Sequence, residues 1–344
     1  MKSRYHLETL NLNFELYPLS MALKYRSGRA RQFALVCMLL SLGACALPAP
    51  GDLPSDIKLR ETASLIEDVK SFGKTLGIEP TGALSKTSGG ERALSMLWLW
   101  LQKAGTLAVA TSMDIRMAVG FVAAKERLPL EQVYRVDGYS VYYRQGNEYA
   151  DSRSAATPAF AAQGVVRRVT VILHEDLHGD SNFDLPWDIE EGVVTPLGSL
   201  AAVEYFRYKD DLGNFQRAQS AVAEGKRIAR ELRELVLEAE GIFRTFPLEE
   251  AKLKILGALS RYPTYRSMFE RQIAGQHPPT VLEAKLSHDL AYFRFFAAIA
   301  ALAESQLPLK AMIAELKTLP QNATPDLVEK FLQGLSDKYP AAAN

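Results

Sequence analysis

Residues 171–180 read VILHEDLHGD and contain the pattern H-E-x-x-H, with His174 and His178 four residues apart and Glu175 directly after the first histidine. The chain has only five histidines in 344 residues, so this pattern is a specific signal. On a helix, the two histidines share one face, with Cβ atoms about 5–6 Å apart, and both rings can reach one metal ion. On a strand they would stand about 13 Å apart, too far to share an ion.

Two features of this region bear on the choice between strand and helix. Five β-branched residues favour a strand by propensity: Val165, Val166, Val169, Val171 and Ile172. Apolar residues at 166, 169, 173 and 177 instead follow helix spacing, and the periodic stretch 160–177 is longer than an ordinary strand. Gly179 is a typical helix stop. We therefore predict a helix that ends near Gly179.

A metal site also needs a third protein ligand, because a catalytic zinc ion has three and leaves its fourth position to water. Residues 184–195 supply carboxylates at the start of a second predicted helix. Glu191 is the preferred ligand, since the small Gly192 beside it lets this helix lie close against the first, and Glu190 is the alternative. Glu175 is then placed to act as general base toward a metal-activated water. The sequence predicts one Zn²⁺ per chain.

The rest of the chain has a mainly helical pattern. The stripe from Leu59 to Phe72 predicts an N-terminal helix, and the apolar segment 94–101 and the segment 115–125 predict two more. The clear strand candidate is Tyr139–Tyr143, which is rich in aromatic and β-branched residues. Beyond residue 192 we predict further helices, at 228–243, 249–260, 280–304, 307–318 and 325–336.

The N-terminal region has the pattern of an export signal. From Met21, which we take as the true start, basic residues precede a short apolar run that ends in Leu42-Gly43-Ala44-Cys45. This ending resembles the lipobox of bacterial lipoproteins, in which the cysteine carries lipid and becomes the first mature residue. We therefore expect a protein held to a membrane through Cys45 in the bacterial envelope, facing the periplasm. A plain secretory signal is the alternative. The only other cysteine, Cys37, lies inside the apolar run, so no disulfide is expected.

Charge and composition bound the class of protein. Lys and Arg together number 40 and Asp and Glu together number 40, so the charge balance gives no support for a nucleic acid partner.

We expect a leader and signal over residues 1–45, a Pro-rich tether over 46–54 and a single domain over 55–344. Within that domain we expect a helical part (55–135), the metal-site region (136–210) and a second helical part (211–344).

The motif and its spacing also resemble a known group. His174-Glu-Asp-Leu-His178, twelve residues and then Glu191-Gly-Val-Val-Thr195 resemble the gluzincin zinc metallopeptidases. More narrowly, the chain is similar to a family of bacterial lipoproteins described as aminopeptidases, with H-E-L-A-H followed by N-E-S-F-A-T. The resemblance places the metal ligands on His174, His178 and Glu191 and the general base on Glu175. It implies a mainly α, zincin-like fold, with a small, reduced β-sheet before the metal helix and a helical C-terminal half.

The chain departs from that family in places. Glu190 stands where the family has Asn, Asp176-Leu177 replace Leu-Ala, and the segment before the metal helix is shorter and has fewer strands. The specific motif covers only residues 170–195.

These observations together predict a lipid-anchored zinc peptidase that acts on a peptide substrate and, by the resemblance, is an aminopeptidase. The candidates for contact with the transition state or substrate are Tyr205, Tyr208, His288, Tyr292 and Glu190. Asp188 and Glu204 are, with Glu190, candidates to hold a free amine.

Two alternatives use the same residues. One is a non-catalytic helical envelope lipoprotein that binds a partner or a cell-wall ligand and has a structural or vestigial metal site, with Asp180 or Asp184 as a fourth ligand. The other is a metal-dependent hydrolase of a non-peptide bond.

Overall fold

The computed structural model describes residues 56–88, 94–123, 136–146, 148, 150, 154–180, 183–305 and 307–340. All of these belong to one compact unit, residues 34–344. The expected start at Met21, the lipobox with Cys45 and the Pro-rich tether lie outside the described residues. None of the described helices has both the length and the apolar character needed to cross a bilayer.

The H-E-x-x-H segment is helical, as its apolar spacing predicts. Helix α4 (Val165–Gly179) is buried at ten consecutive residues, from Val169 to His178. It lies between α1 (Asp56–Thr75) and α5 (Trp187–Tyr208), and it also contacts α6 (Leu212–Thr245). Packing on several sides explains how a run of β-branched residues forms a helix, because burial outweighs their weak preference for strands.

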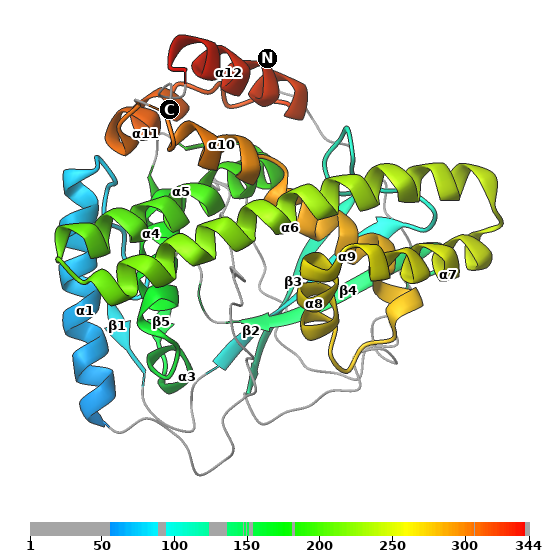
Figure 1. The fold of residues 1–344 in the computed structure, drawn as a ribbon. Coiled ribbons are helices and arrows are strands. Elements are labelled where there is room, and N and C mark those ends of the chain that lie inside the picture. Colours follow the sequence, from blue (N-terminus) through cyan, green and yellow to red (C-terminus); the bar gives the residue numbers. More distant parts are fainter. Residues whose placement is uncertain are drawn as a thin grey trace, which may run out of the picture. The chain divides into compact units, whose positions relative to one another are not determined.

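The second helix of the site, α5, is equally enclosed. Of its 22 residues, all but Trp187, Glu204, Arg207 and Tyr208 are buried. It contacts α4, α6, α9 (Pro278–Phe293), α10 (Phe296–Leu302) and α11 (Leu309–Leu316), so it runs through the middle of the helical layers (Figure 1). The position of Glu191 therefore depends on elements from most of the described chain.

The structure is mainly helical with a small sheet before α4, as expected, but two strands of this sheet were predicted as helices. Segment 94–101, expected to be a helix, is strand β2 (Leu94–Lys103), and segment 115–125 is β3 (Ile115–Ala123). With β4 (Tyr139–Gly146), which confirms the predicted strand, they form an antiparallel sheet in the order β3-β2-β4. Within the expected helical part over 55–135, the described residues form a helix followed by strands.

The reason for this error is burial on both faces of β2. Leu97, Leu99 and Leu101 pack into one apolar cluster, whereas Trp98 and Trp100 pack into another. A strand covered on both faces has no polar alternation, and its continuous apolar run cannot be told from a buried helix by periodicity.

Two short strands, β1 (Lys86–Thr87) and β5 (Ala155–Ala156), pair in parallel next to α1. The short helix α3 (Pro158–Ala161) follows β5 and leads to α4. These connections hold the start of the metal helix against α1.

The C-terminal half is helical, as predicted. Its elements are α6 (Leu212–Thr245), α7 (Leu248–Ala258), a 3-10 turn (Leu259–Arg261), α8 (Pro263–Gln272), α9 (Pro278–Phe293), α10 (Phe296–Leu302), α11 (Leu309–Leu316) and α12 (Pro325–Lys338). The predicted helix 280–304 is divided between α9 and α10. Helix α9 covers one face of the sheet through β2 and β4, and the long helix α6 passes both α5 and α9 (Figure 1).

Candidate metal centre

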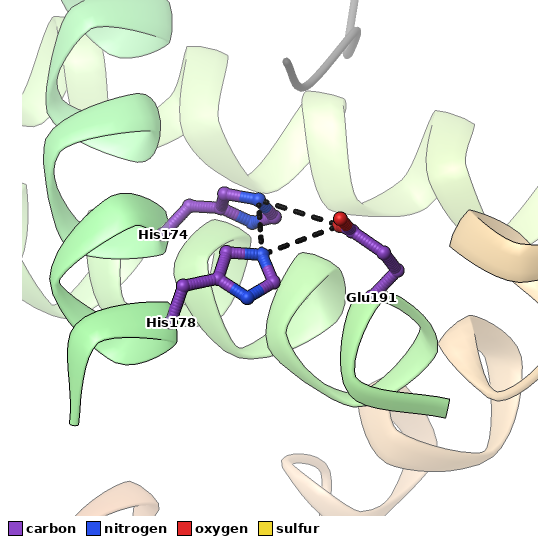
Figure 2. A group of neighbouring side chains, drawn as sticks. All are labelled: His174, His178 and Glu191. Atoms are coloured by element: carbon purple, nitrogen blue, oxygen red, sulfur yellow. Dashed lines mark hydrogen bonds and ion pairs between the residues drawn. The ribbon is translucent and has the colours of Figure 1, made fainter. Parts of the chain in front are cut away.

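The three predicted ligands lie together. Figure 2 shows the rings of His174 and His178, one turn apart on α4, pointing toward the carboxylate of Glu191 on α5. Their potential ligand atoms all lie within 4.8 Å of one another, and all three residues are buried. This buried group can hold a metal ion, because two imidazoles and one carboxylate are a donor set that Zn²⁺ accepts.

The spacing of the donor atoms fits an ion between them. The two Nε2 atoms are 3.0 Å apart, and they lie 3.6 Å (His174) and 3.3 Å (His178) from Oε2 of Glu191. Ligand atoms of a tetrahedral ion at about 2.0–2.2 Å stand about 3.3–3.6 Å from one another, so both distances to Glu191 match, whereas the two ring nitrogens lie somewhat closer together than around such an ion. Neither oxygen of Glu191 has a hydrogen-bond partner among the described residues, although the side chain is buried. A buried carboxylate without hydrogen-bond donors is suited to bind a cation.

Glu190 has a different position from the one that the sequence suggested. Its Oε1 lies 2.6 Å from Nδ1 of His178, on the side of the ring away from Glu191. Nδ1–H therefore donates to Glu190, which leaves the Nε2 lone pair of His178 directed at the other ligands. Burial acts to lower the pKa of His178, but Glu191 and Glu190 outweigh it and hold this pKa well above its ordinary value.

His174 is kept neutral by its surroundings. Burial above all, and then the charges of His178 and Arg167, hold its pKa well below the ordinary value, against the backbone of Val194. The two histidines thus differ in protonation, and binding of a metal releases a proton from the pair.

The close approach of the two helices depends on Gly198 and not on Gly192. A Cβ at Gly198 would lie 3.0 Å from Cβ and 3.2 Å from Cα of His174. A Cβ at Gly192 would instead meet the backbone oxygen of Ala291 in α9 and the ring of Phe295 just after it, and no atom of α4. The expectation for Gly192 was therefore wrong, because the face of α5 next to Glu191 packs on α9.

Glu175 is buried beside the ligands. Neither of its carboxylate oxygens has a hydrogen-bond partner within the described residues. Burial above all raises the pKa of Glu175 well above its ordinary value, and Glu191 raises it further while His178 opposes. Desolvation therefore raises the proton affinity of this carboxylate.

The additional acids of the motif point away from the ligands. Asp176 accepts from Nζ of Lys70 at 2.5 Å and from the backbone N–H and hydroxyl of Thr81 at 2.9 and 2.8 Å. Asp180 is paired with Lys317. Both acids thus fasten neighbouring segments to α4, and Asp184 is exposed and accepts from a glutamine. Of the residues that the structure describes, only His174, His178 and Glu191 form a metal-binding group.

Two of the tyrosine candidates lie far from the ligands. Tyr205 is fourteen residues after Glu191 on α5, about 21 Å along the helix, and Tyr208 is one turn further. The hydroxyl of Tyr205 donates to Asp68 at 2.5 Å, and Tyr208 is exposed. Neither is placed to contact a substrate at the metal, because about four turns of α5 separate Tyr205 from Glu191.

The candidates on α9 lie nearer. The ring of Tyr292 is 6.3 Å from that of Trp187, the residue one turn before Glu191. The ring of His288 is 4.7 Å from that of Tyr292, and its Nδ1 bonds Asp289 at 2.9 Å. Tyr292 is therefore the candidate on α9 that lies nearer to the metal ligands, and His288 lies one turn of α9 before it.

Of the amine-binding candidates, only Asp188 fits. It is buried one turn before Glu191, and its Oδ1 accepts from Ser112 at 3.0 Å while Oδ2 has no hydrogen-bond partner among the described residues. Glu204 is paired with Arg207 at 2.6 Å on the outer part of α5.

Two further features of this part of the fold carry no sequence motif. Arg116 on β3 lies over the ring of Trp187 at 4.5 Å, and a buried ion pair joins Lys285 and Asp289 on α9. The i, i+4 spacing of the latter pair is visible in the sequence. The place of Arg116 follows from the pairing of β3 with β2, which the helical expectation for these segments concealed.

Comparisons of the chain with protein-family models, with curated proteins and with solved structures find no match. The geometry of the site is therefore the basis for a functional conclusion.

Proposed function

We propose that this protein is a zinc-dependent peptidase that works by metal-activated water with Glu175 as general base. The observation that carries this proposal is the convergence of His174, His178 and Glu191, with an unpartnered buried carboxylate beside them. Three protein ligands are the set of a catalytic zinc site, whereas structural zinc sites have four.

Each residue has a definite task in this proposal. When bound, zinc polarises the scissile carbonyl and lowers the pKa of water to about 7. Glu175 accepts a proton from the attacking water and passes it to the nitrogen of the leaving amine. His174, His178 and Glu191 hold the ion, and Glu190 fixes the tautomer of His178. Burial of the whole group strengthens these electrostatic interactions.

The aminopeptidase activity rests on the family resemblance and on Asp188. An aminopeptidase must hold the free amine of its substrate, and Asp188 is a buried carboxylate one turn from Glu191 with an unpartnered oxygen. The anchored, periplasm-facing location rests on the lipobox. Cys45→Ser should move the protein from the membrane fraction to the soluble fraction of cells.

The non-catalytic alternative has less support. It needs a fourth protein ligand, and its two candidates are bonded elsewhere, Asp180 to Lys317 and Asp184 to Gln321. Hydrolysis of a non-peptide bond would use the same residues as the peptidase.

The test compares two variants of the purified protein. The wild type should contain about one zinc ion per chain. Glu175→Gln should keep the zinc and lose peptidase activity by about 10²- to 10⁴-fold, because the amide cannot accept the proton. Asp184→Asn, a change at an exposed acid on the same segment, should keep both zinc and activity. Absence of zinc after gentle purification, or full activity of Glu175→Gln, would refute the proposal.

A further inference from the structure

The metal helix α4 has buried carboxylates on the side away from its ligands. Asp176 and Asp180 each lie two residues from His178, about 200° around the helix, whereas the ring of His178 points toward Glu191 (Figure 2). Both acids are buried. A buried carboxylate near the C-terminal end of a helix is unfavourable twice, because it loses water and because the helix dipole is negative there. The metal ligands alone do not explain these two acids.

Two lysines from distant parts of the chain compensate the two acids. Nζ of Lys70 on α1 lies 2.5 Å from Oδ1 of Asp176, and Nζ of Lys317, directly after α11, is paired with Oδ2 of Asp180. The lysine side chains are themselves only 12% and 16% exposed. Each lysine also donates to a backbone carbonyl of the segment that follows α1. The ion pairs therefore tie the metal helix to α1 and to the end of α11.

The segment that follows α1 lies directly against the end of α4. The N–H and the hydroxyl of Thr81 donate to Asp176 at 2.9 and 2.8 Å, and the N–H of Glu79 donates to Asp180 at 3.4 Å. A Cβ at Gly179 would overlap the methyl group of Thr81 and lie 3.0 Å from its Cβ, so this approach requires a glycine. We call the whole group the brace of α4; its members are Lys70, residues 77–81, Asp176, Gly179, Asp180 and Lys317.

The brace holds the part of α4 that has the least support from the helix itself. His178 is in the last turn, where backbone carbonyls lack partners within the helix and local opening is easiest. A buried ion pair contributes little net stability compared with an apolar pair of the same size, because both charges lose water. Its hydrogen bonds nevertheless require a defined geometry. The brace thus restricts where the last turn of α4 lies more than it stabilises the fold.

We propose that Lys70 and Lys317, acting through Asp176 and Asp180, are positioning residues that hold His178 in place for the metal. The inference rests on the metal centre of the proposed function and not on the reaction. Zinc holds the last turn of α4 from one side and the brace holds it from the other. Each should therefore strengthen the other by the same factor, and coupled sites in proteins commonly do so by about 5- to 150-fold.

Hydrogen exchange of the unmodified full-length protein, with and without zinc, measures this coupling without a mutation. The amides of Glu79 and Thr81 bond the two acids, so they should exchange at least about fivefold more slowly when zinc is bound. The amide of Tyr265 is the matched control, because it also donates to a carboxylate, that of Glu231 at 2.7 Å, but lies on α8 and outside the brace. Unchanged exchange at Glu79 and Thr81, or equal slowing at Tyr265, would overturn the inference.

Variants test the same coupling from the other direction. Lys70→Met and Lys317→Met each leave one acid of the brace without its cation, and each should weaken zinc binding about tenfold, the lower end of the range for groups bonded to a ligand itself. At saturating cobalt the visible absorption bands should also change, because they report the geometry of the ligands and not the folded fraction. Thr81→Val removes one donor to Asp176 at nearly constant size. It should change zinc affinity in the same direction but less, and it serves if a lysine variant does not fold.

Lys285→Met is the control matched for stability. It also leaves a buried carboxylate without its cation, but on α9 and outside the brace, so it should lower stability while zinc affinity and the cobalt spectrum stay as in the wild type. Unchanged zinc affinity and cobalt spectrum in the brace variants would overturn the inference, as would the same change in Lys285→Met. A wild type that binds no zinc would refute the metal centre and this inference together. Full activity of Glu175→Gln would refute only the peptidase proposal.

Discussion

The hydrogen bond between Glu190 and His178 makes a quantitative prediction about metal affinity. Nδ1 of His178 and Oε1 of Glu190 are 2.6 Å apart, and the two side chains are 0% and 5% exposed. A hydrogen bond to a charged group contributes about 1.5–3 kcal/mol. Loss of a partner that orients a metal-binding histidine weakens metal affinity by about 10- to 100-fold, which is about 1.4–2.7 kcal/mol. The two ranges agree.

We therefore expect Glu190→Gln to weaken zinc binding by about 10- to 100-fold. The glutamine has the same shape but no charge, and its amide can turn either its oxygen or its nitrogen toward Nδ1, so the tautomer of His178 is no longer fixed. Zinc affinity is measured by competition with a chelating dye, with circular dichroism as a check on folding. Glu191→Gln should have a larger effect, because it changes a ligand.

Glu204→Gln is the matched control. It lies on the same helix but in a partly exposed pair with Arg207, so zinc affinity should not change. Wild-type affinity in Glu190→Gln would refute the role of Glu190, as would an equal loss in Glu204→Gln.

Three further predictions concern packing and buried charge. Gly198→Ala places a Cβ 3.0 Å from that of His174, so α4 and α5 must separate, and both the melting temperature and zinc affinity should fall, at a cost of about 1–3 kcal/mol. Lys285→Met leaves Asp289 buried without its cation and should lower the free energy of unfolding in urea by about 3–5 kcal/mol. Burial, opposed by Asp289, lowers the pKa of His288 from 6.5 to about 4, so the unfolded chain binds this proton first as pH falls. Stability from this group is present above pH 6.5 and lost toward pH 4, and His288→Gln should reduce that loss by about 3 kcal/mol in unfolding measured at both pH values.

Two of these predictions have a matched control variant, and the third has a stated outcome that would contradict it. Gly257→Ala, where no atom lies within 4 Å of the added Cβ, should stabilise α7 by up to about 1 kcal/mol, and a loss like that of Gly198→Ala would contradict the packing argument. Lys254→Met removes an exposed pair with Glu250 and should change stability little. For His288, the same acid sensitivity in wild type and variant would show that other groups determine it.

Much of the helical architecture follows from local patterns. The stripe from Leu59 to Phe72 predicts α1, and similar stripes predict α6, α7, α11 and α12, because a helix with one buried face repeats its apolar residues every three to four positions. Strand β2 was missed for the opposite reason. Trp98 and Leu99 are both buried, on opposite faces of β2, so the alternation that marks a strand is absent.

At the metal centre, too, some features follow from the sequence alone and others only from the tertiary structure. The sequence by itself determined that His174, Glu175 and His178 share one helix and that two of them face the same way, since helical period is a local property of the chain. Only the tertiary structure decided that Glu191 completes the group, that Glu190 holds His178, and that Asp176 and Asp180 bind lysines on the other side. These outcomes depend on how closely α4 and α5 approach at Gly198 and on which face of α5 meets α9. Contacts between helices are set by the packing of residues far apart in the sequence, and no local pattern encodes that distance.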